Sequence, residues 1–271
     1  MKNINLTDIL VYPVKSTTGF SLEEVEVENK GLPFDRNFGI IGHDDKIITA
    51  RENPKLLNIA TKLQNNILEL SSFGKASIQL SLDNLPQMKS LRVGIFSDFT
   101  RAIPVEHEVN NWISTVLQQP AKLVKTDPIT PRKIKDKYHP QAEEIISFCD
   151  AAPIHLISEA SLADLNSQLA QPVMVPRFRP NLVIKGAEAW VEDHWRQIEI
   201  GECIFEVVAK TARCSFLTIH PQTTERNKNQ EPLRTLSKIK KSTNEVTFGI
   251  YLIPRKLGLI KKGDHVTVLA D

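Results

Sequence analysis

Short apolar runs, each ended by turn-forming residues, recur along most of the chain. Near the N-terminus, residues 9–12 form such a run that ends at Pro13, and residues 22–27 alternate between apolar and polar side chains. Proline cannot donate a hydrogen bond inside a central sheet, and such alternation is typical of a half-buried strand. A chain with this pattern is expected to bury its apolar residues mainly in β-sheets.

Two pairs of these runs predict β-hairpins. Residues 38–41 are followed by residues 47–50 after a polar connection, and residues 59–64 are followed by residues 67–71 after Asn65-Asn66. Asparagine tolerates the positive φ that a tight hairpin turn requires. Further strands are expected near Ile78, Leu91 and Ile103 and over residues 121–126, 154–157, 182–185, 198–200, 204–208, 246–253 and 265–269.

Only three segments have helical character. Residues 107–117 carry their apolar side chains on one stripe. Ser158 is a favourable N-cap for a helix that runs to Leu169, and residues 232–238 are a short helix candidate. Many short strands with few helices predict a mainly β fold with some helices (α+β) and a barrel-like architecture.

The chain has 271 residues, which is enough for one large domain or two modest ones. A polar stretch over residues 127–147 is too long for an idle connection, so it is either a mobile lid or an ordered cover over a site. Its basic residues either guide an anionic substrate or an acidic redox partner, or form a solvated loop. We place a boundary just before this stretch and predict an N-terminal domain over residues 1–120 and a second domain over residues 121–271.

The formal net charge of +2 gives no general attraction to nucleic acid or to an anionic membrane. The N-terminus lacks the features of a signal peptide, and no apolar run is long enough to span a membrane. Three cysteines without metal-finger spacing do not form a disulfide framework, and Cys149 and Cys203 are interpreted as buried, inert residues. We therefore expect a cytoplasmic protein that binds neither nucleic acid nor a membrane.

Three basic positions in the first part of the chain lie beside strand ends. Lys15 and Ser16 follow the first strand, and their ammonium and hydroxyl groups suit a phosphate; the alternative is a solvated surface lysine. Arg36, at the entrance of an apolar strand, either binds a phosphate or pairs with a carboxylate such as Asp35. Arg51 has the same two alternatives.

Polar and thiol side chains later in the chain suit a heterocycle and a metal. Arg179 and Asn181 can both reach the edge of an aromatic heterocycle that carries carbonyl and amine groups. Cys214 follows an apolar strand and stands beside Arg213, whose guanidinium favours the thiolate. A thiolate is a suitable ligand for a thiophilic metal, whereas the alternative is a buried, unreactive cysteine.

The motifs become specific in combination, in one fixed order along the chain. They are Tyr12-Pro13-Val14-Lys15-Ser16, Gly31-Leu32 with Asp35-Arg36, Thr49-Ala50-Arg51, residues 158–166, Phe178-Arg179-Pro180-Asn181, Arg213-Cys214, Glu231-Pro232-Leu233 and Gly263-Asp264. This order resembles the MOSC superfamily, in which an N-terminal MOSC β-barrel domain precedes a MOSC domain. Within it, the chain resembles the mitochondrial amidoxime reducing component and its bacterial relatives. The resemblance spans nearly the whole chain.

The resemblance implies a molybdopterin cofactor whose molybdenum is bound by one protein cysteine. That position matches Cys214, which the resemblance makes both the metal ligand and the catalytic residue. The implied cofactor-binding residues are Lys15, Ser16 and Arg36 near the phosphate and pterin, Arg179 and Asn181 at the pterin, and Ala212 and Arg213 beside the cysteine. The cofactor is then expected at the interface between the two domains.

The implied activity is the reduction of N-hydroxylated substrates, such as amidoximes, hydroxylamines and N-hydroxylated bases, by a molybdenum-cofactor oxidoreductase. Many bacterial relatives continue into a ferredoxin domain, whereas this sequence ends at Asp271 without clustered cysteines. We therefore expect no iron–sulfur cluster in this chain and a separate electron-donor protein, ferredoxin-like or cytochrome b5-like with a reductase. One departure from the family pattern is Thr211-Ala212, where relatives often carry Cys-Ser.

Two other functions are considered beside this one. A MOSC module of the same kind can carry the cofactor, or carry sulfur as a Cys214 persulfide, for delivery elsewhere. A cysteine hydrolase needs a base, for which His155, His194 and His220 are candidates. None of these histidines lies in a recognisable nucleophile motif.

Overall fold

Strands dominate the computed structural model, as the recurrent short apolar runs predict. The structure describes residues 3–83, 85, 88–105, 108–138, 140, 144–240 and 245–271. Within these residues it contains the α-helices α1 (Val109–Leu117), α2 (Glu159–Ser167) and α3 (Leu233–Ile239). The predicted fold class, mainly β with some helices, is confirmed.

The largest element is an eight-stranded sheet. In spatial order it contains β19 (Val266–Ala270), β15 (Gln197–Ile200), β16 (Cys203–Ala212), β17 (Thr247–Lys256), β13 (Ile154–Ser158), β14 (Leu182–Lys185), β1 (Asn5–Val11) and β2 (Phe20–Leu22). Strands β13 and β14 are parallel, and the other neighbours are antiparallel. The sheet thus takes its last two strands from the N-terminus of the chain.

Smaller sheets complete the fold. Four strands form the order β4 (Phe38–Ile41), β10 (Lys122–Thr126), β9 (Asp98–Pro104) and β8 (Leu91–Ile95), and three form β5 (Ala60–Gln64), β6 (Ile67–Ser72) and β7 (Lys75–Ser81). Two-stranded pairs are β18 (Gly258–Lys261) with β3 (Glu24–Val27), and β11 (Arg132–Lys133) with β12 (Ile145–Ile146). Short 3-10 helices are η1 (Pro54–Asn58), η2 (Asp136–Tyr138), η3 (Val175–Arg177), η4 (Val191–His194) and η5 (Ser215–Thr218).

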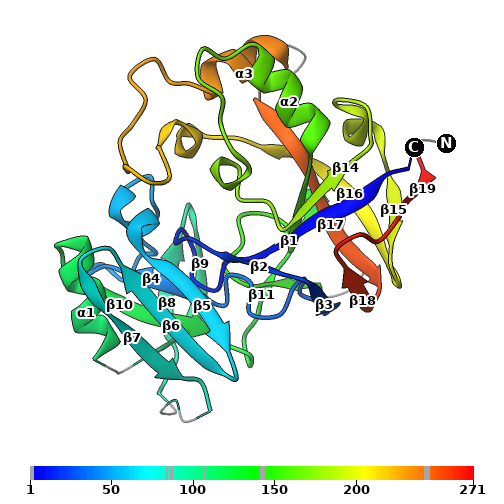
Figure 1. Cartoon of the computed structure of the whole chain (residues 1–271). Coiled ribbons are helices and arrows are strands. Elements are labelled where there is room, and N and C mark those ends of the chain that lie inside the picture. Colours follow the sequence, from blue (N-terminus) through cyan, green and yellow to red (C-terminus); the bar gives the residue numbers. More distant parts are fainter. Residues whose placement is uncertain are drawn as a thin grey trace.

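Strand pairing joins the two ends of the sequence. Ile9 of β1 is opposite Leu182 of β14, and Val25 of β3 is opposite Ile260 of β18. Conversely, β10 pairs with β4 and β9 in the N-terminal four-stranded sheet. In Figure 1, β1 runs from the C-terminal sheet towards the N-terminal sheets. Pairing therefore crosses residue 120 in both directions, and the domain boundary predicted there stays a prediction.

Apolar side chains separate into clusters that match these sheets. One cluster packs the eight-stranded sheet and includes Ile9, Leu156 and Phe205, all buried. A second lies between α1 and the N-terminal strands and includes Leu68 and Ile113. A third joins α2 and α3 to the large sheet and contains Phe178 and Phe248, whose rings stack with centroids 4.1 Å apart. The third cluster supports the segment that begins at Phe178.

One of the two predicted hairpins is confirmed, and the other is correct at its turn but wrong in its second strand. Strands β5 and β6 pair across Asn65 and Asn66, whose φ values are 51° and 57°. Residues 47–50 form no strand; Ile47 makes only an isolated bridge with Ile41, and the Ile48 N–H donates to the carbonyl of Ile40 at 2.8 Å. The Gly42 N–H donates to the Lys46 carbonyl at 3.1 Å, so the chain reverses where predicted, but the pairing is too short to form a strand. Strand β18 was not predicted from the sequence.

The helix predictions hold with small shifts at the ends. Residue His107, the predicted start of the first helix, lies outside the described residues, and α1 begins at Val109. The Ser158 hydroxyl accepts a hydrogen bond from the Ala160 N–H at 3.2 Å and so caps α2 as predicted. Helix α2 ends at Ser167, two residues before the predicted Leu169.

The described part of the polar stretch over residues 127–147 is ordered. Strands β11 and β12 pair with each other, and Ile134 and Ile146 pack against Ile253 of β17. Arg255 of β17 pairs with the carboxylate of Glu144 and, at 2.6 Å, with that of Glu206. Among the helices of the described residues, none combines the length and the apolar character that crossing a membrane requires.

Candidate functional site

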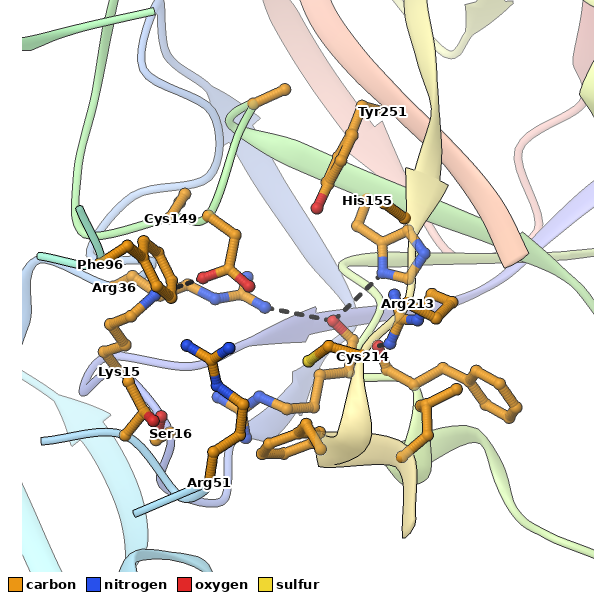
Figure 2. A pocket seen from close by; sticks show the side chains of 18 of the residues that line it. Lys15, Ser16, Arg36, Arg51, Phe96, Cys149, His155, Arg213, Cys214 and Tyr251 are labelled. Atoms are coloured by element: carbon orange, nitrogen blue, oxygen red, sulfur yellow. Dashed lines mark hydrogen bonds and ion pairs between the residues drawn. The ribbon is translucent and has the colours of Figure 1, made fainter. Parts of the chain in front are cut away.

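All eight residues predicted from the sequence to hold a cofactor or metal line one pocket. They are Lys15, Ser16, Arg36, Arg179, Asn181, Ala212, Arg213 and Cys214. Figure 2 shows Lys15, Ser16 and Arg51, from the N-terminal part of the chain, on one side of this pocket, with His155, Arg213 and Cys214 on the other. The fold thus brings together segments that are far apart in the sequence.

Lys15 is held in the wall of the pocket by the segment that follows β12. Its Nζ donates to the carbonyl oxygen of Phe148 at 2.8 Å and forms an ion pair with the carboxylate of Asp150. Desolvation opposes a charge on Asp150, but the Lys15 ammonium outweighs it and lowers the pKa of Asp150 to about 2. The Asp150 carboxylate is therefore charged at neutral pH, while burial lowers the pKa of Lys15 and Asp150 opposes that shift. The solvated alternative for Lys15 is wrong, because the residue is buried.

The guanidinium of Arg36 is occupied by hydrogen bonds and an ion pair within the protein. Nη1 pairs with the buried carboxylate of Asp35 and donates to Asn181 Oδ1 at 3.0 Å, and Nη2 donates to the Arg179 carbonyl at 3.1 Å. The guanidinium also lies 4.4 Å from the ring centroid of Tyr12. Burial works against the charge, but the Asp35 carboxylate raises the pKa of Arg36 above its usual value. The salt-bridge alternative with Asp35 is realised in the structure, and a phosphate contact of Arg36 stays a prediction.

The side-chain amide of Asn181 also forms hydrogen bonds within the protein and holds two backbone segments together. Its Oδ1 accepts from the N–H of His155 at 3.2 Å as well as from Arg36, and its Nδ2 donates to the carbonyl of Leu10 at 3.1 Å. The side chain thereby joins β1, the start of β13 and the segment before β14. Asn181 lines the pocket with its amide already engaged, so its pterin contact also stays a prediction.

Arg179 and Arg213 keep donors available. Arg179 Nη1 bonds the carbonyl of Thr17, while its Nη2 is buried without a hydrogen-bond partner among the described residues. Arg213 Nη2 donates to the Phe178 carbonyl at 2.8 Å, and its Nε is likewise buried and unpaired. Burial, together with the nearby charge of Arg36, lowers the pKa of Arg179 to about 10. Buried N–H groups without a partner are costly, which favours an acceptor-rich ligand beside them.

Cys214 is exposed, in contrast to the other two cysteines. It precedes η5, and its carbonyl accepts from the Leu217 N–H at 3.1 Å, which fixes the backbone but leaves the thiol open to the pocket. Burial raises the pKa of the Cys149 thiol to about 12 and that of the Cys203 thiol to about 11. Both were interpreted as buried and inert, and both are buried. The alternative of a buried Cys214 is wrong.

Four of the pocket residues have a positive φ. The φ values are 70° for Ser16, 49° for Arg36, 56° for Phe96 and 54° for Arg179. A residue other than glycine in this region costs about 1–3 kcal/mol and persists where surrounding bonds hold it. The Arg36 N–H donates to the Tyr12 carbonyl at 2.8 Å, and its carbonyl accepts from the Phe148 N–H at 2.9 Å. The fold therefore holds these residues at a conformational cost, as is common at ligand sites.

The pocket has the character needed for an anionic, acceptor-rich ligand. Five cationic side chains line it, namely Lys15, Arg36, Arg51, Arg179 and Arg213, against the carboxylate of Asp150. The hydroxyl of Thr49, the Nη2 of Arg179 and the Nε of Arg213 are buried there without partners among the described residues. An exposed thiol lies in the same pocket. These features fit a molybdopterin, which presents a phosphate, a polar heterocycle and a metal for a thiolate.

Several lining residues were not selected from the sequence as site residues. Arg51 was left with two alternatives, and Thr49 was noted only as part of the Thr49-Ala50-Arg51 motif. Phe96 and Tyr251 carried no signal, because nothing local in the sequence indicates that distant strands converge on one pocket. Of the three histidines considered as a hydrolytic base, only His155 lines this pocket. Its two ring nitrogens face backbone carbonyls, Nδ1 that of Arg179 at 3.5 Å and Nε2 that of Phe248 at 3.3 Å.

His155 gives a testable pH dependence of stability. Burial, aided by the charge of Arg213, lowers the pKa of His155 well below its usual value, so the folded protein holds the ring neutral. The unfolded chain takes up a proton near pH 6.5. The stability linked to His155 is therefore complete above about pH 6.5 and is lost as the pH falls below that value towards the folded-state pKa. We expect the urea midpoint to decrease between about pH 7 and pH 5.

The variant His155→Gln should flatten this dependence, because the substituted side chain does not titrate. His194→Gln is the matched control, since His194 is exposed and lies outside the pocket. It should keep the slope of the parent. Equal slopes in His155→Gln and the parent would show that another group causes the acid sensitivity.

Comparison with known proteins identifies the family. The model of the MOSC N-terminal beta barrel domain matches residues 3–120, and the model of the MOSC domain matches residues 143–267. Mitochondrial amidoxime reducing component 2 of Rattus norvegicus is 32% identical over 98% of this chain and 83% of its own length, and component 1 of Homo sapiens is 30% identical with the same coverage. The molybdenum cofactor sulfurase of Oryza sativa subsp. japonica is 30% identical over 93% of this chain, which spans 33% of that longer protein. The chain therefore belongs to the MOSC family and contains both its N-terminal β-barrel domain and its MOSC domain.

Proposed function

We propose that the protein is a molybdenum-cofactor-dependent oxidoreductase that reduces N-hydroxylated substrates. The observation that supports this most is the exposed Cys214 thiol in a pocket with five cationic side chains. A thiolate is a suitable ligand for molybdenum, and guanidinium and ammonium groups suit a phosphate. The similarity to two amidoxime reducing components over almost the whole chain adds to this support.

The residues present fit the roles that such a cofactor requires. Cys214 is proposed as the metal ligand, and the unpaired N–H groups of Arg179 and Arg213 as donors to the heterocycle. Lys15 and Ser16 are proposed at the phosphate. Arg36, Asn181 and Ala212 line the same pocket, and the first two orient the backbone around it.

When bound, the molybdenum cofactor supplies two-electron oxygen-atom transfer, which suits the reduction of an N–OH group. The overall reaction consumes two electrons and two protons and gives the amine or amidine and water. The protein contributes orientation and charge. We propose that the electrons come from a separate donor protein of the ferredoxin-like or cytochrome b5-like kind.

A second candidate function is delivery of the cofactor or of sulfur, with Cys214 as a persulfide carrier. Two observations favour it, namely the exposed thiol and the similarity to a molybdenum cofactor sulfurase. The pocket suits both functions, because each needs the same grip on the cofactor. Catalytic turnover distinguishes them.

The test is purification from a host that makes the cofactor and, in parallel, from a host that does not. We expect about one molybdenum and one pterin per chain in the first preparation only, the ratio that one thiolate ligand implies. With a chemical reductant, that preparation should reduce benzamidoxime to benzamidine repeatedly. A loaded protein without turnover would favour the carrier, and equal activity from both hosts would contradict both functions.

A further inference from the structure

We propose that Arg51 is the principal anion-binding residue of this pocket, held in place by the ring of Phe96. The group it binds is an oxyanion, either a phosphate monoester or a carboxylate, of the molecule that occupies the pocket. Only the identity of that molecule rests on the proposed function. The binding of an oxyanion to Arg51 can be tested without it.

Two of the other cations in the pocket already have a carboxylate partner, which leaves Arg51 as a candidate anion-binding residue. Lys15 is neutralised by Asp150 and bonded to the carbonyl of Phe148. Arg36 is neutralised by Asp35 and bonded to Asn181 and to the Arg179 carbonyl. A cation that already has a carboxylate partner gains little from a second anion. These two residues therefore shape the pocket and contribute less to anion affinity than their charges suggest.

Arg179 and Arg213 each use one guanidinium nitrogen to bind a backbone carbonyl, of Thr17 and of Phe178, whereas Arg51 offers its whole guanidinium. Among the described residues, no carboxylate or carbonyl accepts a hydrogen bond from Arg51, and its guanidinium lies 5.1 Å from the ring centroid of Phe96. Its own carbonyl accepts from Arg226 Nη2, which fixes the backbone beneath the side chain. A guanidinium presents a planar fork of N–H donors that matches phosphate and carboxylate. Arg51 is therefore the cation of this pocket that is best able to take up an anion.

Phe96 occupies a position that local structure does not favour. It is the first residue of the two-residue turn between β8 and β9, where Ile95 is opposite Asp98, and its φ is 56°. A turn with positive φ only at this position normally takes glycine. The ring is 48% exposed, so burial does not explain it. The ring centroid lies 4.8 Å from Lys15 Nζ and 5.1 Å from the Arg51 guanidinium carbon. Cation–π contact with these two side chains therefore explains why an aromatic residue stands here.

The first experiment measures binding of inorganic phosphate and pyrophosphate to the full-length protein from a host without the cofactor. Isothermal titration calorimetry should show that Arg51→Gln weakens binding about tenfold, because charge-assisted hydrogen bonds are lost. Arg92→Gln is the matched control, since Arg92 stacks at 3.7 Å on the exposed ring of Phe99 but does not line the pocket. It should bind as the parent does. Affinity within twofold of the parent in Arg51→Gln, or no phosphate binding by the parent, overturns the proposal.

A second set of variants tests the role of the ring. Phe96→Ala should weaken phosphate binding about threefold, whereas Phe96→Tyr keeps an aromatic face and should match the parent. Phe99→Ala should have no effect. If Phe96→Ala binds phosphate as tightly as the parent, Arg51 does not depend on this ring.

The source of the oxyanion is settled with the cofactor-loaded protein. If it is the cofactor phosphate, Arg51→Gln loses pterin during desalting in high salt, and the ratio of KM values for benzamidoxime and 4-carboxybenzamidoxime does not change. If it is a substrate group, the variant keeps its pterin and loses a preference of the parent for the carboxylated substrate. Either result supports Arg51 as an anion site. Unchanged pterin retention together with an unchanged KM ratio overturns it.

Discussion

Replacement of Cys214 by serine is expected to remove molybdenum from the purified protein and to lower benzamidoxime reduction about 10³-fold or more, a loss of about 4 kcal/mol. A serine hydroxyl is a harder and far less acidic group than a thiol, and it is a poor ligand for a thiophilic metal. Because Cys214 is exposed, the substitution should change the free energy of unfolding of the protein by no more than about 0.5 kcal/mol. Metal analysis, turnover and thermal unfolding of one preparation measure all three effects.

Cys203→Ala is the matched control for this variant. Cys203 is buried in the large sheet, where its thiol contacts the carbonyl of Gly258 at 3.2 Å, and it does not line the pocket. The control should keep its molybdenum while losing some stability. Full molybdenum content and activity in Cys214→Ser would refute the assignment of the metal ligand.

Arg36→Ala is expected to destabilise the protein by about 3–5 kcal/mol, the usual cost of removing one partner of a buried ion pair. Asp35 is 2% exposed, and its carboxylate also accepts from the Tyr12 N–H at 2.9 Å. Without the guanidinium, that carboxylate stays buried without its countercharge. Urea unfolding of the cofactor-free protein measures the loss independently of any ligand. The pocket should also loosen, because Arg36 holds Asn181 and the Arg179 carbonyl.

Two further variants test whether loss of the Asp35–Arg36 ion pair causes the destabilisation of Arg36→Ala. The double variant Asp35→Asn with Arg36→Ala should recover part of the lost stability, since no unpaired charge remains. Lys30→Ala removes a half-buried lysine that pairs with Glu28 at 3.4 Å near the surface, and it should cost less than about 1 kcal/mol. A loss as small as that in Arg36→Ala would contradict the structural role of Arg36.

The sequence predicted correctly those features that depend on interactions between neighbouring residues. The Asn65-Asn66 turn and the Ser158 cap were predicted correctly, because both depend on the conformations and hydrogen bonds of neighbouring residues. The hairpin to residues 47–50 was correct only at its turn, because the Ile47 N–H also binds the Gly94 carbonyl of a distant strand and residues 47–50 form no strand. Strand β18 was missed because its partner is β3, near the other end of the chain.

For the site, the sequence predicted which residues line the pocket but not how those residues are paired. The motif order selected eight residues that the fold does bring into one pocket. It could not show which cations are already neutralised, since Lys15 meets Asp150 only after the segments have folded together. For the same reason it left Arg51 undecided. Which guanidinium is unpaired depends on three-dimensional contacts that motif spacing does not contain.

The insertion of β1 beside β14 has a consequence for how the molecule is made. In the eight-stranded sheet, β14 has only β13 beside it until β1 joins its other edge, although β1 leaves the ribosome long before β14. A fragment that starts after β10 would present the open edges of β14 and β18 to solvent, and open edges pair readily with other chains. Supplying residues 1–126 as a second polypeptide should restore such a fragment to solubility, because these residues carry β1 and β3. The two halves of this sequence are then complementary pieces of one sheet, and the ligand pocket exists only where they are joined.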